Sequence, residues 1–168
     1  MDLNKITKDE LIHSAVIVLH ELNTDSLILT KRSEHLRSHP GEISFPGGLW
    51  EEHDNNYYDT ALRELNEELG VSRDRVTLIK ELTPEPTLAG VIIHPWLGTI
   101  ESINPYVLNT YEVTSLVVVP MEQVHQRKNY RKIRIERSGF QFITWEFIPK
   151  NDYIWGATAR IMKQLIIE

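Results

Sequence analysis

Short apolar runs separated by turn-forming residues make up much of the chain. Such runs are typical of β-strands, and they occur at residues 15–20, 27–30, 76–82, 91–100 and 115–120. The polar residues 21–25 join the first two runs as a predicted hairpin. A second hairpin is predicted from residues 131–136 and 142–148, which flank the turn residues Ser138-Gly139.

Residues 57–69 carry the three- and four-residue spacing of an amphipathic helix. The apolar stripe consists of Tyr58, Ala61, Leu62, Leu65 and Leu69. Polar residues 54–56 provide start signals, and Gly70 stands where a C-terminal cap is expected. A short helix at 121–125 and a closing helix at 154–167 complete the predicted elements.

The order of these elements predicts the fold class. Strands flanked by a few helices, without regular alternation of strand and helix, favour an α+β fold with a mixed sheet over a doubly wound fold. Residues 32–48 lack a steady period and contain Pro40, Gly41, Pro46, Gly47 and Gly48. We predict a loop there, and a loop with so many special backbone positions is a favoured place for function.

Length and composition narrow the class of protein. The 168 residues are 41% hydrophobic and 25% charged, as in an ordinary globular chain, and we expect a single domain spanning residues 1–168. No cysteine is present, which excludes a disulfide framework, a thiolate zinc site and a cysteine nucleophile. The formal net charge of −6 argues against whole-surface binding of nucleic acid.

The chain also lacks membrane signals. No apolar run approaches the roughly 18 residues of a membrane span, and residues 1–5 contain no signal-peptide core. We therefore expect a cytoplasmic protein that does not bind membranes. Its oligomeric state is left open, a homodimer included.

Three acidic residues of the predicted helix share one face. At roughly 100° per residue, Glu64, Glu67 and Glu68 fall within a sector of about 100°. Like charges at these spacings are mildly unfavourable, and a divalent cation would reverse that sign. Oxygen ligands favour Mg²⁺ or Mn²⁺. The alternative is a solvated helix face, which most charge runs are. The upstream Gly47-Gly48, whose backbone could approach a metal, favours the cation site.

Nine positions in and before this helix resemble the Nudix box, the signature of hydrolases that cleave a nucleoside diphosphate linked to another group. They are Gly48, Asp54, Arg63, Glu64, Leu65, Glu67, Glu68, Gly70 and Val71. One departure is that eight residues rather than seven separate Asp54 from Arg63. The resemblance implies a Nudix-type α/β/α sandwich and an enzyme that uses Mg²⁺ or Mn²⁺.

The loop before the box resembles the coenzyme A pyrophosphatase branch of that family. The matching residues are Ile28-Leu29-Thr30-Lys31-Arg32-Ser33, Arg37, Gly41 and Phe45-Pro46-Gly47-Gly48. That branch tends to carry the longer spacing, so the departure supports the assignment. Weaker resemblances follow at Pro95 with Gly98, at Glu112-Val113 and at residues 155–159.

The resemblance implies metal-assisted attack of water on one phosphorus of a diphosphate. From coenzyme A or an acyl-CoA, the products would be the phosphopantetheine half and adenosine 3′,5′-bisphosphate. Bound cations would also explain how an acidic protein handles an acidic substrate, because they supply the positive charge. Positioning and charge stabilisation then carry the reaction, as in phosphoryl transfer generally.

The same resemblance assigns metal-binding roles. Glu64 and Glu68 would be metal ligands, with Glu67 as a further ligand or as the residue that orients the water. The main-chain carbonyl of Gly48 would complete the set. Glu112 is the candidate for a later acid that acts as ligand or base; a surface Glu that opens a strand is the alternative, and Glu85 and Glu101 compete for the role.

Other residues are assigned to the substrate or to the fold. Arg32 and Arg37 would bind substrate phosphates, since a guanidinium matches phosphate oxygens with two hydrogen bonds. Arg63 would be a structural partner that fixes the glutamates. Tyr153 and Trp155 would line the pocket or, more commonly for aromatic residues at a helix start, belong to the core.

Two alternatives to coenzyme A hydrolysis stay open. The first keeps the chemistry and changes the substrate to NADH or a nucleotide sugar. The second is a Nudix fold retained as a ligand-binding module without turnover, against which the complete glutamate set argues.

Overall fold

The computed structural model describes residues 11–149 and 152–168, so the expectation about residues 1–5 falls outside the described part. The strands are β1 (Ile12–Glu21), β2 (Ser26–Arg32), β3 (Ile43–Ser44), β4 (Gly47–Leu49), β5 (Thr77–Glu81), β6 (Glu85–Pro86), β7 (Val91–Ile100), β8 (Val113–Pro120), β9 (Tyr130–Arg137), β10 (Phe140–Phe147) and β11 (Ile154–Trp155). The helices are α1 (Tyr57–Leu69), α2 (Met121–Val124) and α3 (Gly156–Lys163), with 3₁₀ turns η3 (Arg73–Arg75) and η4 (Arg127–Asn129).

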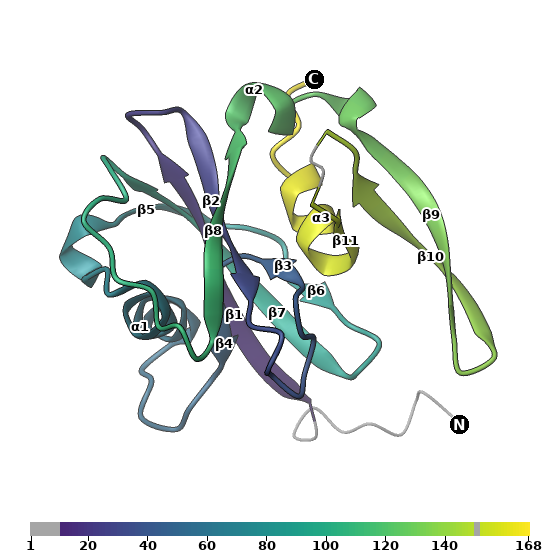
Figure 1. Ribbon diagram of the computed structural model, residues 1–168, viewed down its shortest axis with the longest axis horizontal. Helices are drawn as coiled ribbons and strands as arrows, with labels where there is room; N and C mark the ends of the chain where they lie inside the picture. Colours follow the sequence, from purple (N-terminus) through teal and green to yellow (C-terminus); the bar gives the residue numbers. More distant parts are fainter. Residues whose placement is uncertain (1–10, 150–151) are drawn as a thin grey trace.

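A mixed eight-stranded sheet forms the centre of the molecule (Figure 1). Its main order is β3-β2-β1-β7-β5, while β8 pairs with β2, β4 with β1 and β6 with β7. The strands β1 and β7 run parallel, and the other pairs are antiparallel. The predicted α+β fold with a mixed sheet is confirmed.

Both faces of the sheet are covered, which explains why β1 reads as a continuous apolar run. Successive side chains alternate between the faces. Ala15, Ile17 and Leu19 pack with Ala61, Leu65 and Leu69 of α1. On the other side, Val18, Leu27 and Leu29 pack with Ile161 and Met162 of α3.

The layer on the second face holds more than a helix. A separate three-stranded sheet, of order β11-β10-β9, packs beside α3 and extends outward as a long hairpin (Figure 1). Its turn residues Ser138 and Gly139 both have positive φ, +50° and +79°, as a tight hairpin turn requires. The α/β/α sandwich therefore has a second, smaller sheet in one outer layer.

The helix α1 has the predicted bounds and caps. The Asn56 side chain accepts a hydrogen bond from the Asp59 main-chain N–H at 2.8 Å and caps the first turn. At the other end, Gly70 has a φ of +64°, and its N–H donates to the carbonyl of Asn66. A left-handed residue is the usual end of a helix, and glycine adopts it without strain.

Two sequence predictions were wrong in their bounds. The predicted loop 32–48 contains the short strands β3 and β4, because both pair with longer strands of the sheet. The predicted helix 154–167 is shorter at both ends. Its first two residues pair with β10 as β11, and after Lys163 the Gln164 side chain exchanges two hydrogen bonds with the Thr83 main chain.

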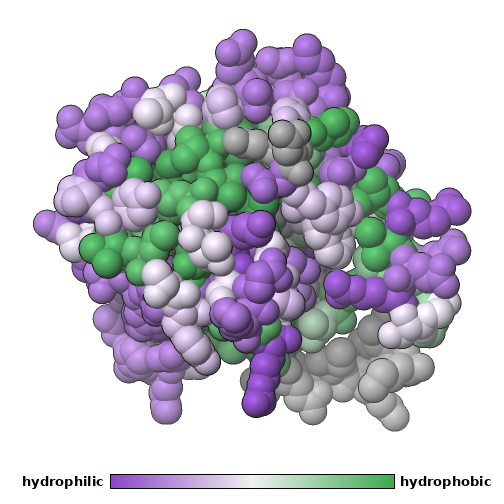
Figure 2. Space-filling view, in the orientation of Figure 1, coloured by the Kyte–Doolittle hydropathy of each residue, from purple (hydrophilic) through white to green (hydrophobic). Residues whose placement is uncertain are grey.

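The surface seen in Figure 2 is mostly hydrophilic, with hydrophobic residues gathered over the sheet near β2 and β8. No helix in residues 11–149 or 152–168 is long and apolar enough to cross a membrane. That the whole chain forms one domain stays a prediction.

Candidate active site

The Arg63 guanidinium connects four other groups at one edge of α1. Its Nε and Nη2 donate to the two carboxylate oxygens of Asp54 at 2.9 and 3.0 Å, and Nη2 also donates to the Leu49 carbonyl at 3.0 Å. Its Nη1 donates to Oε1 of Glu64 at 3.0 Å and to Oε1 of Glu67 at 3.2 Å. A planar guanidinium with five donors suits such a hub.

Asp54 is the fixed partner in this hub. Its carboxylate also accepts hydrogen bonds from the Thr60 hydroxyl at 2.9 Å and from the Glu51 main-chain N–H at 3.0 Å. The hydrogen bonds from Arg63 hold the pKa of Asp54 well below its usual range. The same contact raises the pKa of Arg63. Asp54 and Arg63 therefore form a permanent ion pair.

Two adjacent glycines allow close packing beside the helix. The strand β4 pairs with β1, and a Cβ atom on Gly47 would lie 2.3 Å from the Ala15 carbonyl oxygen. A Cβ on Gly48 would lie 2.4 Å from Cδ of Glu64. The Glu64 carboxyl is thus packed directly against the Gly48 backbone, at a distance that a side chain would prevent.

Glu68 lies one helical turn beyond Glu64 and is buried, at 7% exposure. Its Oε2 has no hydrogen-bond partner among the described residues. Burial, followed by the charges of Glu64 and Glu112, raises the pKa of Glu68 to about 8. Burial and the Glu67 charge raise the pKa of Glu64 to about 7. The Arg63 contact with Glu64 and the charge of Arg32 near Glu68 lower these pKa values, but burial and the neighbouring acids outweigh them.

The loop between β7 and β8 brings Glu112 to the same place. The Asn109 N–H donates to the main-chain carbonyl of Glu68 at 2.9 Å, and the Ser33 N–H donates to the Glu112 carbonyl at 2.8 Å. The competing acids lie elsewhere: Glu85 is paired with Arg160 of α3 at 3.1 Å, and Glu101 is exposed just after β7. The structure therefore brings Glu112, of the three candidates, to the carboxylate pair.

The two arginines predicted to bind phosphate differ in their placement. Arg32 donates from Nε and Nη2 to the Ser38 carbonyl at 3.2 and 3.0 Å, and its charge lowers the pKa of Glu68. It therefore lies close to the carboxylates. Arg37 is exposed on the same loop, and within the described part of the chain it forms no ion pair with the acids of α1.

The comparisons with known proteins decide the family. The family model of the NUDIX domain matches residues 11–137. This chain belongs to the Nudix family. The Nudix hydrolase NudL of Yersinia pestis, named as uncharacterized, is 32% identical to it over 140 residues, which are 83% of this chain and 70% of that protein.

Solved structures show the same fold. The Ap4A hydrolase of Caenorhabditis elegans in a binary complex is 17% identical with a TM-score of 0.55, over 65% of this chain and 80% of that one. The MutT protein of Methanosarcina mazei is 20% identical, also with a TM-score of 0.55, over 68% and 80%. This Nudix hydrolase is an enzyme of the pyrophosphatase class that acts on a nucleoside diphosphate derivative.

Nudix hydrolases generally use divalent metal ions, and the donors of this one fit such an ion. A hard cation would bind the unpartnered Glu68 oxygen and the Glu64 carboxyl that lies against Gly48. It would also stabilise the charged form of both acids, whose pKa values are raised without it. No three His, Asp or Glu side chains within residues 11–149 and 152–168 converge as a finished metal site. Glu67, half exposed, is instead paired with Arg63.

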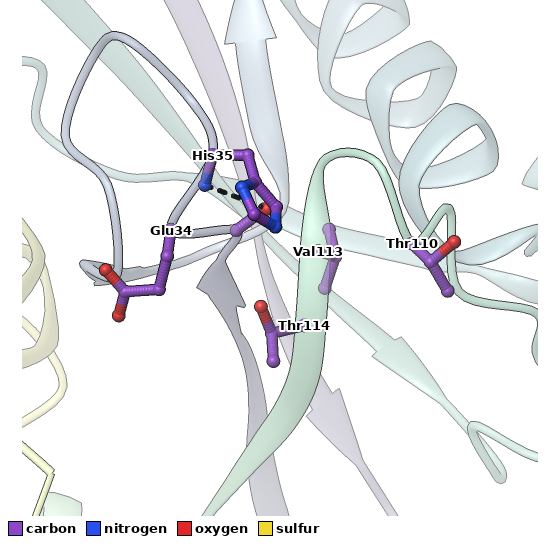
Figure 3. A pocket seen from close by; sticks show the side chains of 6 residues that line it. Glu34, His35, Thr110, Val113 and Thr114 are labelled. Atoms are coloured by element: carbon purple, nitrogen blue, oxygen red, sulfur yellow. Dashed lines mark hydrogen bonds between the residues drawn. The ribbon is translucent and has the colours of Figure 1, made fainter.

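A cavity of about 360 Å³ lies between the segment that follows β2 and the start of β8. Figure 3 shows its walls: Glu34 and His35 follow β2, while Thr110, Val113 and Thr114 belong to the end of the β7–β8 loop and the start of β8. A second cavity of about 300 Å³ is lined by Lys31 and by Tyr153 and Trp155, whose rings stack 5.7 Å apart. The two aromatic residues thus belong to a cavity wall rather than to the core.

Sequence reasoning missed one group that shapes this Nudix hydrolase. Arg75, in the turn after α1, binds four main-chain carbonyls of the β7–β8 loop. In the sequence it is one basic residue in the polar stretch Ser72-Arg73-Asp74-Arg75, and no signal there distinguishes it from a surface arginine.

Proposed function

We propose that this Nudix hydrolase cleaves the diphosphate of coenzyme A or of an acyl-CoA. Water adds its oxygen to one phosphorus, and the products are the phosphopantetheine half and adenosine 3′,5′-bisphosphate. The observation that carries the reaction type is the buried Glu68 carboxylate, with an unpartnered oxygen, next to Glu64 and Gly48. The choice of substrate rests on the resemblance of residues 28–48 to the coenzyme A branch.

Glu64, Glu68 and the Gly48 carbonyl would hold Mg²⁺ or Mn²⁺. Supporting this, Oε2 of Glu68 has no hydrogen-bond partner among the described residues, the pKa of both acids is raised, and the Gly48 backbone lies against the Glu64 carboxyl. Glu67, whose side chain is 49% exposed, can leave Arg63 and supply a further oxygen. A bound divalent cation would neutralise the diphosphate and make water a better nucleophile at neutral pH.

Glu67 and Glu112 are the candidates to orient the attacking water and accept its proton. Glu112 is supported by its place beside the Glu64–Glu68 pair, whose pKa values its charge raises. Glu67 is supported by its position on the same helix face and its solvent exposure. A carboxylate within hydrogen-bond reach of the water is what general base catalysis needs.

Arg32 and Arg37 would bind the phosphates of the substrate. Arg32 is the better supported, because its guanidinium, held by the Ser38 carbonyl, lies near Glu68. It uses Nε and Nη2 in that contact, which leaves Nη1 for a phosphate oxygen. Arg37 reaches the phosphates only if its loop carries it inward on binding.

A substrate panel tests the proposal. The purified protein is incubated with Mn²⁺ or Mg²⁺ and coenzyme A, acetyl-CoA, NADH, ADP-ribose or a nucleotide sugar, and products are identified by mass. ADP-ribose is included because the NUDIX domain of Shewanella oneidensis NrtR was solved with it; that domain is 19% identical, with a TM-score of 0.51 over 74% of this chain and 80% of its own.

We expect adenosine 3′,5′-bisphosphate from both coenzyme A compounds, and none when EDTA replaces the metal. Faster cleavage of NADH or a nucleotide sugar, with no adenosine 3′,5′-bisphosphate from coenzyme A, would overturn the substrate while leaving the reaction type in place. An absence of cleavage of every panel member would favour the binding module without turnover.

A further inference from the structure

The Arg75 guanidinium is enclosed by the backbone of a neighbouring loop. Its Nη1 donates to the Pro105 carbonyl at 2.8 Å. Its Nη2 lies 2.9 Å from the carbonyl oxygen of Ser102, 3.2 Å from that of Ile103 and 3.1 Å from that of Asn104. Four consecutive carbonyls therefore face one cation.

The same loop continues to the candidate active site. After the segment held by Arg75, the Val107 N–H donates to the Leu69 carbonyl at 2.9 Å, and the Asn109 N–H donates to the Glu68 carbonyl at 2.9 Å. The Glu112 N–H then donates to the Asn109 carbonyl at 3.0 Å, which closes a turn. We call the contact of Arg75 with residues 102–105 the clamp. The loop between the clamp and Glu112 is held by main-chain hydrogen bonds at Val107, Asn109 and Glu112.

Arginine is suited to this contact in a way that lysine is not. A curled loop segment without secondary structure presents carbonyls that have no strand partner, and each must be satisfied or left to solvent. A guanidinium offers five donors in a rigid plane, whereas an ammonium is a compact point charge with three. Arg75 also belongs to η3, which follows α1 directly, so the clamp ties the loop to the helix that carries Glu64 and Glu68.

We propose that Arg75 is a positioning residue for the hydrolysis: by gathering the carbonyls of residues 102–105, it holds the β7–β8 loop so that Glu112 stays beside Glu64 and Glu68. This inference rests on the role proposed above for Glu112. Arg75 does not touch the substrate in this scheme and acts only through the loop. Its removal therefore lowers kcat more than it changes KM.

A double-mutant cycle tests this route. Arg75→Gln, Glu112→Gln and the double variant are compared with the parent protein, using Mn²⁺ and coenzyme A, or the most rapidly cleaved panel member if coenzyme A is not a substrate. Arg73→Gln is the matched control, because Arg73 lies in the same η3 turn but pairs with Asp59 at 3.0 Å instead of the loop. Thermal unfolding of each variant shows whether it folds, and Arg75→Lys replaces Arg75→Gln if the latter does not.

We expect Arg75→Gln to lower kcat about tenfold with KM nearly unchanged, and Arg73→Gln to leave both unchanged. In the Glu112→Gln background, Arg75→Gln should cause little further loss, because residues that act through one another are not additive. Equal losses in both backgrounds, or full activity of Arg75→Gln, would overturn the positioning role alone. Full activity of Glu112→Gln would overturn the proposed role of Glu112 and this inference with it.

Discussion

Two buried acids at the helix α1, Asp54 and Glu68, have pKa values shifted in opposite directions. Asp54 and Glu68 are buried to the same degree, at 8% and 7% exposure. Arg63 holds the pKa of Asp54 far below its usual range, whereas the pKa of Glu68 rises to about 8. At Glu68 burial and the charges of Glu64 and Glu112 dominate, whereas at Asp54 the hydrogen bonds from Arg63 outweigh the effect of burial.

The contrast separates a carboxylate whose oxygens are all partnered from one that keeps an unpartnered oxygen. The Asp54–Arg63 pair is complete within the protein, since each carboxylate oxygen has a donor. At the Glu64–Glu68 pair, Oε2 of Glu68 has no partner among the described residues, and the pKa values of both acids are raised, to about 7 and about 8. Groups with such strongly perturbed pKa values gather at functional sites.

The largest effect on activity should come from removing the charge of Glu68. Glu68→Gln keeps the size of the side chain and removes a proposed metal ligand, so we expect hydrolysis to fall by about 1,000-fold, or roughly 4 kcal/mol of transition-state stabilisation. Thermal unfolding at pH 8 without metal should be unchanged or higher, because a poorly compensated charge has gone. Activity within tenfold of the parent would refute the assignment of Glu68 as a ligand.

Alanine at Gly47 should prevent folding, whereas alanine at Gly48 should lower activity without preventing folding. In Gly48→Ala the new methyl group meets the movable end of Glu64, so we expect a stable protein with activity reduced about 100-fold, as the ligand is displaced. In Gly47→Ala it meets the Ala15 main chain, and we expect loss of soluble folded protein. Circular dichroism and activity assays on both variants measure this. Normal activity in Gly48→Ala would contradict the close approach of Glu64 to the backbone.

Breaking the complete pair should act mainly on stability. Asp54→Asn leaves the Arg63 charge without its main partner, and we expect the free energy of unfolding to fall by about 2–4 kcal/mol. Activity should fall less than in Glu68→Gln, because Arg63 still contacts Glu64 and Glu67. Urea denaturation provides the measurement. A variant as stable as the parent would show that the pair is not a structural support.

The last effect is a dependence of stability on pH in the metal-free protein. The folded protein holds protons on Glu64 and Glu68 up to about pH 7 and 8, whereas the unfolded chain releases them near 4.5. The folded state therefore binds more protons between these values, and the metal-free protein should become less stable as pH rises from about 5 to 8. Mn²⁺ should flatten the decline. An equally steep fall in Glu68→Gln would point to other groups.

Local features of the sequence predicted most elements of the fold. The helix α1, with its apolar stripe and Gly70 cap, has the predicted bounds because helix period and capping are local properties. The strands β3 and β4 and the shortened α3 were missed, because distant pairing decided them. For the site, spacing on one helix predicted which glutamates share a face. The pairing of Glu67 with Arg63 is likewise local, at i, i+4 on the same helix. The contact of Arg75 with the β7–β8 loop depends on distant residues that no local pattern describes.

The end of α1 has one further consequence. Helices commonly place a lysine or arginine in the last turn, where the aligned peptide dipoles leave partial negative charge. The last turn of α1 carries no basic residue, and its acidic side chains add to the dipole instead of opposing it. The compensation comes from outside the helix: the carbonyls of Glu68 and Leu69 accept hydrogen bonds from the N–H groups of Asn109 and Val107, so the β7–β8 loop supplies the positive ends of the dipoles that a basic side chain supplies in other helices.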